Sequence, residues 1–125
     1  MSDATWTPAQ FDELTTAEEL VLVIARAGHD TLRFPVWMVT VGAAAYVRSY
    51  LGVSSMWFRR VQAEADQAIS FDGADLEVRF ENVDRLDPVN RAIDAEFDRK
   101  YASFDYVDSM SEPAAVEATL RLVRR

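Results

Sequence analysis

Residues 68–83, AISFDGADLEVRFENV, contain the clearest structural signal in this sequence. The dipeptide Asp72–Gly73 is typical of the tight turn that joins two antiparallel strands. After it, Leu76, Val78 and Phe80 alternate with charged residues. This alternation predicts a strand with one face in the core and the other in water. The segment therefore predicts an antiparallel β-hairpin.

Four further strands and two or three helices are predicted around this hairpin. Short apolar or β-branched runs predict strands at residues 20–25, 32–41, 45–50 and 116–122. Helices are expected from residue 8, over 54–65 with Ser54 as N-cap, and from 88, while 102–113 is expected to be irregular. Six strands in a short, mainly β (α+β) chain favour a small closed or nearly closed antiparallel barrel with helices over its ends.

Two of the helix starts have specific capping patterns. Thr7, Pro8 and Gln10 match an N-cap, a first helical position and the partner residue of a capping box. Asp87–Pro88 repeats the order of cap and proline, and Val89, Ile93 and Phe97 then follow at intervals of four. That spacing predicts one apolar stripe facing the core.

The 125 residues have a net charge of −8, but this charge is unevenly distributed. Residues 31–63 contain four arginines and no acidic residue, so they carry +4 and the rest of the chain carries −12. The acidic whole argues against a nucleic-acid partner, because phosphate backbones are bound by clustered basic residues. The +4 segment remains a candidate site for one small anionic ligand.

Several site classes are excluded by composition. The chain has no cysteine and one histidine, His29, which excludes disulfides, cysteine nucleophiles, thiolate metal sites and a histidine-rich metal site. His29 lies in a Gly-His-Asp sequence and is interpreted as a turn residue. No metal motif or glycine-rich phosphate loop is present. The most apolar stretch, 36–47, is too short to cross a membrane, and no signal peptide is evident, so we expect a cytoplasmic protein with no membrane partner.

The arginines of residues 31–63 occur next to aromatic residues. A hairpin could set guanidinium groups beside flat aromatic walls, and this combination suits a flat, phosphorylated, anionic cofactor. Ser54 and Ser55, at a helix start, would add hydroxyl and backbone N–H donors. The simpler alternative is that the tryptophans are core residues and the arginines pair with acidic residues. The residues in question are Arg33, Trp37, Tyr46, Arg48, Trp57, Arg59 and Arg60.

Five segments, in this order, carry a resemblance to known proteins: RFPVWMV (33–39), AYVRSYLG (45–52), WFRR (57–60), DGADLEVRFENV (72–83) and IDAEFDRKY (93–101). Over nearly its whole length the chain resembles a bacterial family of uncharacterised proteins, the domain of unknown function 2255. It is more distantly similar to flavin- and deazaflavin-binding split barrels, which include pyridoxamine-phosphate-oxidase-like proteins and deazaflavin-dependent nitroreductases.

The resemblance implies one split-barrel domain spanning residues 1–125, with six antiparallel strands and two to three flanking helices. It also implies a homodimer with cofactor clefts at the subunit interface, and flavin mononucleotide or a deazaflavin as the ligand, with no metal. The matching positions place Arg48, Ser49, Arg59 and Arg60 near the cofactor phosphate. Those near the ring or barrel wall are Arg33, Trp37, Tyr46 and Trp57. A lysine common in the flavin members is absent from this block.

The leading functional hypothesis is an oxidoreductase that uses a flavin-type cofactor on a small organic substrate. In it, Arg48, Arg59 and Arg60 clamp the phosphate, and Trp37 and Trp57 wall the cleft. Tyr46 or Tyr101 is the candidate for donating a proton or orienting the substrate. Two alternatives stay open. One is a cofactor-independent isomerase or cyclase acting on a small anionic or polycyclic metabolite; the other is a non-enzymatic small-ligand-binding dimer.

Overall fold

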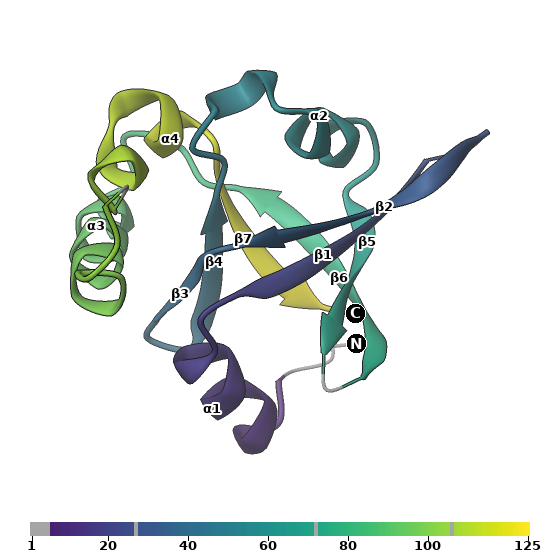
Figure 1. The fold of residues 1–125 in the computed structure, drawn as a ribbon, viewed down its shortest axis with the longest axis horizontal. Helices are drawn as coiled ribbons and strands as arrows, with labels where there is room; N and C mark the ends of the chain where they lie inside the picture. Colours follow the sequence, from purple (N-terminus) through teal and green to yellow (C-terminus); the bar gives the residue numbers. More distant parts are fainter. Residues whose placement is uncertain (1–5, 27, 72, 106) are drawn as a thin grey trace.

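One antiparallel sheet organises the computed structural model, which describes residues 6–26, 28–71, 73–105 and 107–125 (Figure 1). The order of its strands across the sheet is β2-β1-β5-β6-β7-β4-β3. This confirms the mainly β, antiparallel class. The strands are β1 (Leu20–Arg26), β2 (His29–Val36), β3 (Met38–Val41), β4 (Ala44–Arg48), β5 (Asp66–Phe71), β6 (Ala74–Asn82) and β7 (Thr119–Arg124).

Trp37 divides the predicted strand 32–41 into two, so the sheet has seven strands where six were expected. Before Trp37 the chain pairs with β1, and after it the chain pairs with β4. β2 and β3 are therefore the two ends of the strand order, yet only one residue separates them in sequence. The sheet must curl until its ends meet at Trp37, which gives the split barrel. A single straight strand was the wrong prediction because a straight strand cannot exchange one neighbour for another in this way.

The backbone at this bend is held by side chains from a helix. Tyr101 Oη accepts a hydrogen bond from Met38 N at 3.1 Å and donates one to Glu18 O at 2.7 Å. Lys100 Nζ donates to Met38 O at 2.8 Å. Buried backbone groups require partners, so these two residues satisfy the polar atoms that the bend exposes to the interior.

The helices surround the curled sheet (Figure 1), with α2 and α1 at opposite sides of the view and α3 and α4 beside β3 and β4. The capping box at Thr7 and Gln10 is confirmed, as is the buried stripe that contains Ile93 and Phe97. The bounds are α1 (Pro8–Thr16), η1 (Gly52–Ser54), α2 (Met56–Ala63), α3 (Val89–Lys100), η2 (Val107–Ser111) and α4 (Pro113–Glu117), where η marks a 3-10 helix.

Two of the predicted boundaries around α2 were wrong. The strand expected over 45–50 ends at Arg48, because Gly52, at φ 75°, donates its N–H to Ser49 O and turns the chain. The N-cap of α2 is Ser55 rather than Ser54, since Ser55 Oγ accepts from Phe58 N. Ser54 belongs to the preceding 3-10 turn.

The C-terminal region also differs from its prediction. Residues 102–113, expected to be irregular, contain the whole of η2, and Pro113 then starts the one-turn helix α4. The last strand begins at Thr119 rather than at Val116, because Val116 and Glu117 are the last two residues of α4. His29 is the first residue of β2 rather than part of a turn.

Two apolar clusters stabilise the fold. The larger fills the barrel and includes Leu22, Trp57 and Leu120, and the smaller packs Ile93, Phe97 and Tyr101 of the α3 region against β3 and β4. Within the described ranges, no helix has the length and apolar character needed to cross a membrane.

Candidate functional site

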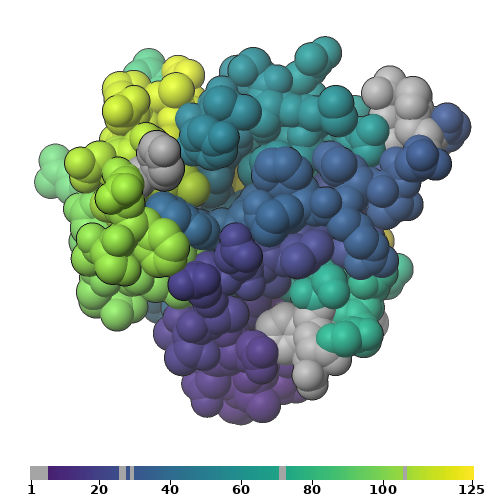
Figure 2. All heavy atoms as spheres, viewed as in Figure 1, coloured from purple at the N-terminus to yellow at the C-terminus, as the bar shows by residue number. Residues whose placement is uncertain are grey.

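A pocket of about 600 Å³ opens where the ends of β2 and β4 meet the η1–α2 segment and η2. The face seen in Figure 2 is hollowed where these blue, teal and yellow-green segments approach one another. Its volume lies in the range of small-molecule sites. It is lined by Glu19, Phe34, Pro35, Val36, Trp37, Arg48, Ser49, Tyr50, Leu51, Ser55, Trp57, Ser109 and Met110.

Two tryptophans contribute to the pocket wall. Trp37, at the bend, stacks on Tyr101 with ring centroids 4.2 Å apart and an interplanar angle of 6°, and Phe104 packs edge-on against it at 5.1 Å. Trp57 belongs to the barrel core, and only 3% of its surface is exposed. The stacking fixes the plane of Trp37, so the wall exists without a ligand.

The pocket also has an exposed apolar rim. Tyr50 and Leu51 are 59% and 58% exposed, and Phe34 is partly exposed. Val53 and Met56, which follow closely in the chain, are exposed as well. Exposed apolar residues that gather around a pocket are typical of a binding surface.

The polar groups of the pocket are mostly neutral. Ser49 Oγ and Ser55 Oγ are 2.8 Å apart and share a hydrogen bond, and Ser55 also caps α2. Ser109 adds a third hydroxyl. Glu19 supplies a carboxylate, and Arg48 is the only cation among the described lining residues.

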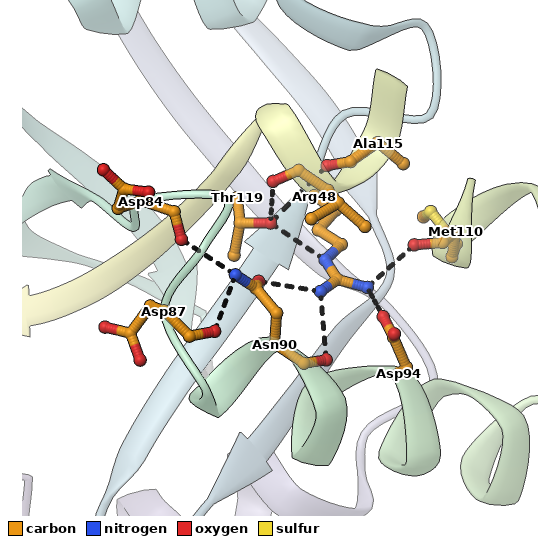
Figure 3. A network of polar contacts seen from close by, with 9 residues as sticks. Arg48, Asp84, Asp87, Asn90, Asp94, Met110, Ala115 and Thr119 are labelled. Carbon is orange, nitrogen blue, oxygen red and sulfur yellow. Dashed lines mark hydrogen bonds and ion pairs between the residues drawn. The ribbon is translucent and has the colours of Figure 1, made fainter. Parts of the chain in front are cut away.

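The Arg48 guanidinium is directed into the protein, where it joins β4 to α3, η2 and β7 (Figure 3). Nε donates to Thr119 Oγ1 at 2.9 Å. Nη1 donates to Asp94 Oδ1 at 2.5 Å and to Met110 O at 2.9 Å. Nη2 donates to Asn90 Oδ1 at 3.0 Å and to Asn90 O at 3.4 Å. A guanidinium has five N–H donors, so all of them have partners within the chain.

The charge of this group is balanced locally. The Arg48 side chain has no exposed surface, whereas the Asp94 side chain is 36% exposed. Burial lowers the pKa of the guanidinium, and the hydrogen bond and negative charge of Asp94 act in the opposite direction. Arginine stays protonated in proteins, so Arg48 and Asp94 form an ion pair that is buried on the arginine side and partly exposed on the aspartate side.

Four of the residues predicted for the cofactor line this pocket: Trp37, Arg48, Ser49 and Trp57. The other arginines do not. Arg33 pairs with Asp75 at 3.1 Å on the surface, and Arg60 Nη1 donates to Asp30 O at 3.3 Å. Arg59 is exposed on α2. The three residues expected to clamp a phosphate therefore do not converge within one chain.

The two tyrosines predicted to act on the substrate do not line the pocket either. The Tyr101 ring lies behind Trp37, and its hydroxyl is directed at the backbone of Glu18 and Met38. Burial raises the pKa of Tyr101 to about 12. Tyr46 is buried in β4 and packs in the smaller apolar cluster.

Sequence reasoning missed two kinds of residue. The first is a set of lining residues that the sequence did not single out. Phe34 and Leu51 belong to the arginine-rich segment 31–63, and Glu19, Ser109 and Met110 come from other parts of the chain. The second is Asp94, which pairs with Arg48. The spacing of Asn90 and Asp94 was the available signal, because residues four apart share a helix face.

A family model matches residues 10–122 of this chain, as uncharacterized proteins conserved in bacteria. The chain belongs to the DUF2255 family. The resemblance found in the sequence is thereby confirmed. No curated protein matches the sequence.

Three solved structures place the fold among known ones. Campylobacter jejuni ChuZ has a TM-score of 0.71 at 11% identity, over 94% of this chain and 52% of its own, so this chain spans about half of ChuZ. A FAD-binding protein of Mesorhizobium loti has a TM-score of 0.63 at 17% identity, over 100% and 94% of the two chains. A protein named F420 reductase has a TM-score of 0.61 at 16% identity, over 95% and 94%. At these identities the similarity establishes a shared fold.

Proposed function

We propose that this protein is a cytoplasmic split-barrel protein whose pocket binds the ring of a flavin-type molecule, a flavin or a deazaflavin. The observation that carries the proposal is the pocket of about 600 Å³ lined by Trp37, whose ring is stacked on Tyr101. A planar ring system gains both apolar burial and stacking against such a wall. The FAD-binding protein and the F420 reductase, F420 being a deazaflavin, share the fold and support this ligand class.

The residues present fit one part of such a ligand and not the other. Aromatic and apolar side chains suit the ring, and the hydroxyls of Ser49, Ser55 and Ser109 can hydrogen-bond its polar edge. The lining offers the phosphate no free cation, since every donor of Arg48 is already used. The ring fits, and the phosphate clamp expected from the sequence does not form in one chain.

The finer proposal is an oxidoreductase acting on a small organic molecule. A bound flavin-type ring would supply the hydride chemistry, and this chain would orient the ring and exclude water from it. We also propose a homodimer. Its interface would cover the exposed apolar side chains at the rim, Phe34, Tyr50 and Leu51, together with Val53 and Met56.

A second candidate, a ligand-binding dimer without catalysis, is favoured by one observation. The described pocket lining offers only Glu19 and the exposed Tyr50 as side chains suited to proton transfer, because Arg48 is saturated and both predicted tyrosines lie outside the lining. The cofactor-independent isomerase loses support for the same reason, since it requires free arginine donors to stabilise an enolate.

The decisive experiment is a binding titration of the purified protein with riboflavin, flavin mononucleotide and F420, followed by fluorescence. We expect saturable binding that Trp37→Ala weakens by roughly tenfold or more, because stacking and burial of one ring are worth about 1–3 kcal/mol. Leu86→Ala is the matched control, since Leu86 is highly exposed and outside the pocket lining. No saturable binding of any of the three would overturn the proposal.

Multiple turnovers of a reduced cofactor with a small electron acceptor would separate the two candidates. Turnover above the rate of the free cofactor supports the oxidoreductase. Binding without such turnover supports the non-catalytic protein.

A further inference from the structure

The charges around the pocket lead to an inference about the ligand's tail, which rests on the proposed function. Phosphate groups in protein sites are held by charge-assisted hydrogen bonds, most often from arginine or lysine. The part of the chain that the structure describes brings one such cation, Arg48, to the pocket lining. The free donors of that cation therefore decide whether a positively charged group can hold a phosphate there.

Arg48 has no donor left for a ligand. Its side chain is completely buried, and its five N–H groups are taken by Thr119, Asp94, Met110 and Asn90. The Asp94 carboxylate is the anion that pairs with this guanidinium (Figure 3). Asn90 Nδ2 is in turn bound to Asp84 O at 2.8 Å and to Asp87 O at 3.2 Å, so the network is closed on that side too.

The net charge of the lining is also unfavourable for an anion. The charge of Arg48 is balanced by Asp94, and Glu19 adds a carboxylate to the lining. The remaining polar side chains of the described lining are neutral, namely serines 49, 55 and 109, Tyr50, and the indoles of Trp37 and Trp57. A phosphate with one to two negative charges would therefore meet a negative local charge rather than a positive one.

We propose that this pocket selects its ligand by the flat, uncharged ring and does not select for a phosphorylated tail. Among flavins, it should bind riboflavin at least as tightly as flavin mononucleotide. Aromatic stacking and apolar burial would supply the affinity. Asp94 and Glu19 are then specificity-determining residues, since their carboxylates set the charge that a ligand's phosphate encounters.

The test compares riboflavin with flavin mononucleotide on the full chain, by quenching of flavin fluorescence at low and high salt. We expect the two dissociation constants to agree within about threefold at both salt concentrations, because no cation contributes a screened attraction. Binding of flavin mononucleotide at least tenfold tighter at low salt, lost at high salt, would overturn this inference and leave the proposed function intact. No binding of either flavin, or of F420, would overturn both.

Two variants test the roles of the carboxylates. Glu19→Gln should improve binding of flavin mononucleotide relative to riboflavin by about threefold, since it removes one solvent-exposed negative charge, whose interactions are weak. Asp94→Asn should act in the same direction by freeing the charge of Arg48. Asp98→Asn is the matched control, because Asp98 is exposed on the same helix. If neither variant changes the ratio while the control behaves as wild type, the carboxylates do not set specificity and that assignment is wrong.

Glu19→Gln keeps the test valid if Asp94→Asn destabilises the fold. Glu19 is exposed and precedes β1, so its substitution leaves the Arg48 network unchanged.

Discussion

The pocket and the polar network meet at Arg48, yet the two regions differ sharply in their chemistry. The pocket has aromatic walls, neutral hydroxyls and one carboxylate from Glu19. The network is buried, densely hydrogen-bonded and charged, and it joins β4, α3, η2 and β7. Arg48, which the sequence predicted to bind a ligand, instead holds together the segments that form one side of the pocket.

Two arginines of residues 31–63, a segment without acidic residues, differ in the same way: one lies on the surface and the other is buried. Arg33 lies on the surface, where it pairs with Asp75 and is more than half exposed. Arg48 is fully buried and holds Met110, which lines the pocket, through its carbonyl oxygen. Removing one partner of a buried pair leaves an uncompensated charge, whereas exposed pairs contribute little to stability.

The largest expected effect is therefore on stability, from Arg48→Met. Asp94 and the carbonyl oxygens of Asn90 and Met110 would lose their donor, and we expect the free energy of unfolding to fall by about 3–5 kcal/mol. Urea denaturation followed by circular dichroism measures this change. Arg33→Met is the control and should cost less than about 1 kcal/mol. Equal, small losses in both variants would show that the network is not what stabilises this region.

A smaller loss is expected from Tyr101→Phe, which keeps the ring behind Trp37 and removes only the hydroxyl. Met38 N–H would lose its acceptor and Glu18 O its donor, so we expect a loss of about 1–3 kcal/mol in the free energy of unfolding. Flavin affinity should change by less than about threefold, because the wall remains. Tyr50→Phe, on the exposed rim, is the stability control. Unchanged stability together with lost turnover would instead return Tyr101 to a catalytic role.

The smallest expected effect is a pH dependence due to Lys100, behind the pocket wall. Burial lowers the pKa of Lys100 to about 8, from 10.5 in the unfolded chain. Between these two values the unfolded chain binds the proton and the folded chain does not, so stability rises as pH increases from about 8 to 10.5. Relative to Lys100→Met, the wild type should gain on the order of 1 kcal/mol over this window, less than the full shift because the group is only half-buried.

Thermal unfolding at several pH values measures this gain as a shift in Tm. Lys100→Arg is the matched control, since arginine keeps its charge throughout the window and should show no such rise. A wild-type curve parallel to that of Lys100→Arg would contradict the prediction.

Local features of the fold were predictable from sequence because they depend on neighbours in the chain. The capping box at Thr7 and the α3 stripe of Ile93 and Phe97 were confirmed, and so was the pairing of β5 with β6 around Gly73; Asp72 itself lies outside the described residues. The candidate wall residues Trp37 and Trp57 were also identified, since aromatic residues in an otherwise basic segment are distinctive.

The predictions failed for two reasons: a distant segment decides the structure at one position, and the local pattern is ambiguous at another. The bend at Trp37 depends on Tyr101, which is far along the chain and satisfies the backbone of Met38. The short helix α4 replaced the start of the last strand, because alternation over a few small residues does not distinguish the two.

By itself, the sequence determined the antiparallel β class, the family, the start of the first helix and the presence of an arginine-rich, aromatic segment in an acidic chain. Only the tertiary structure decided what that segment does. The sequence shows how many arginines the segment contains. Whether a guanidinium has N–H donors free for a ligand depends on which acceptors the fold brings to it. Asp94, Asn90, Met110 and Thr119 lie 42 to 71 residues away from Arg48 in sequence, and folding brings all four into contact with it.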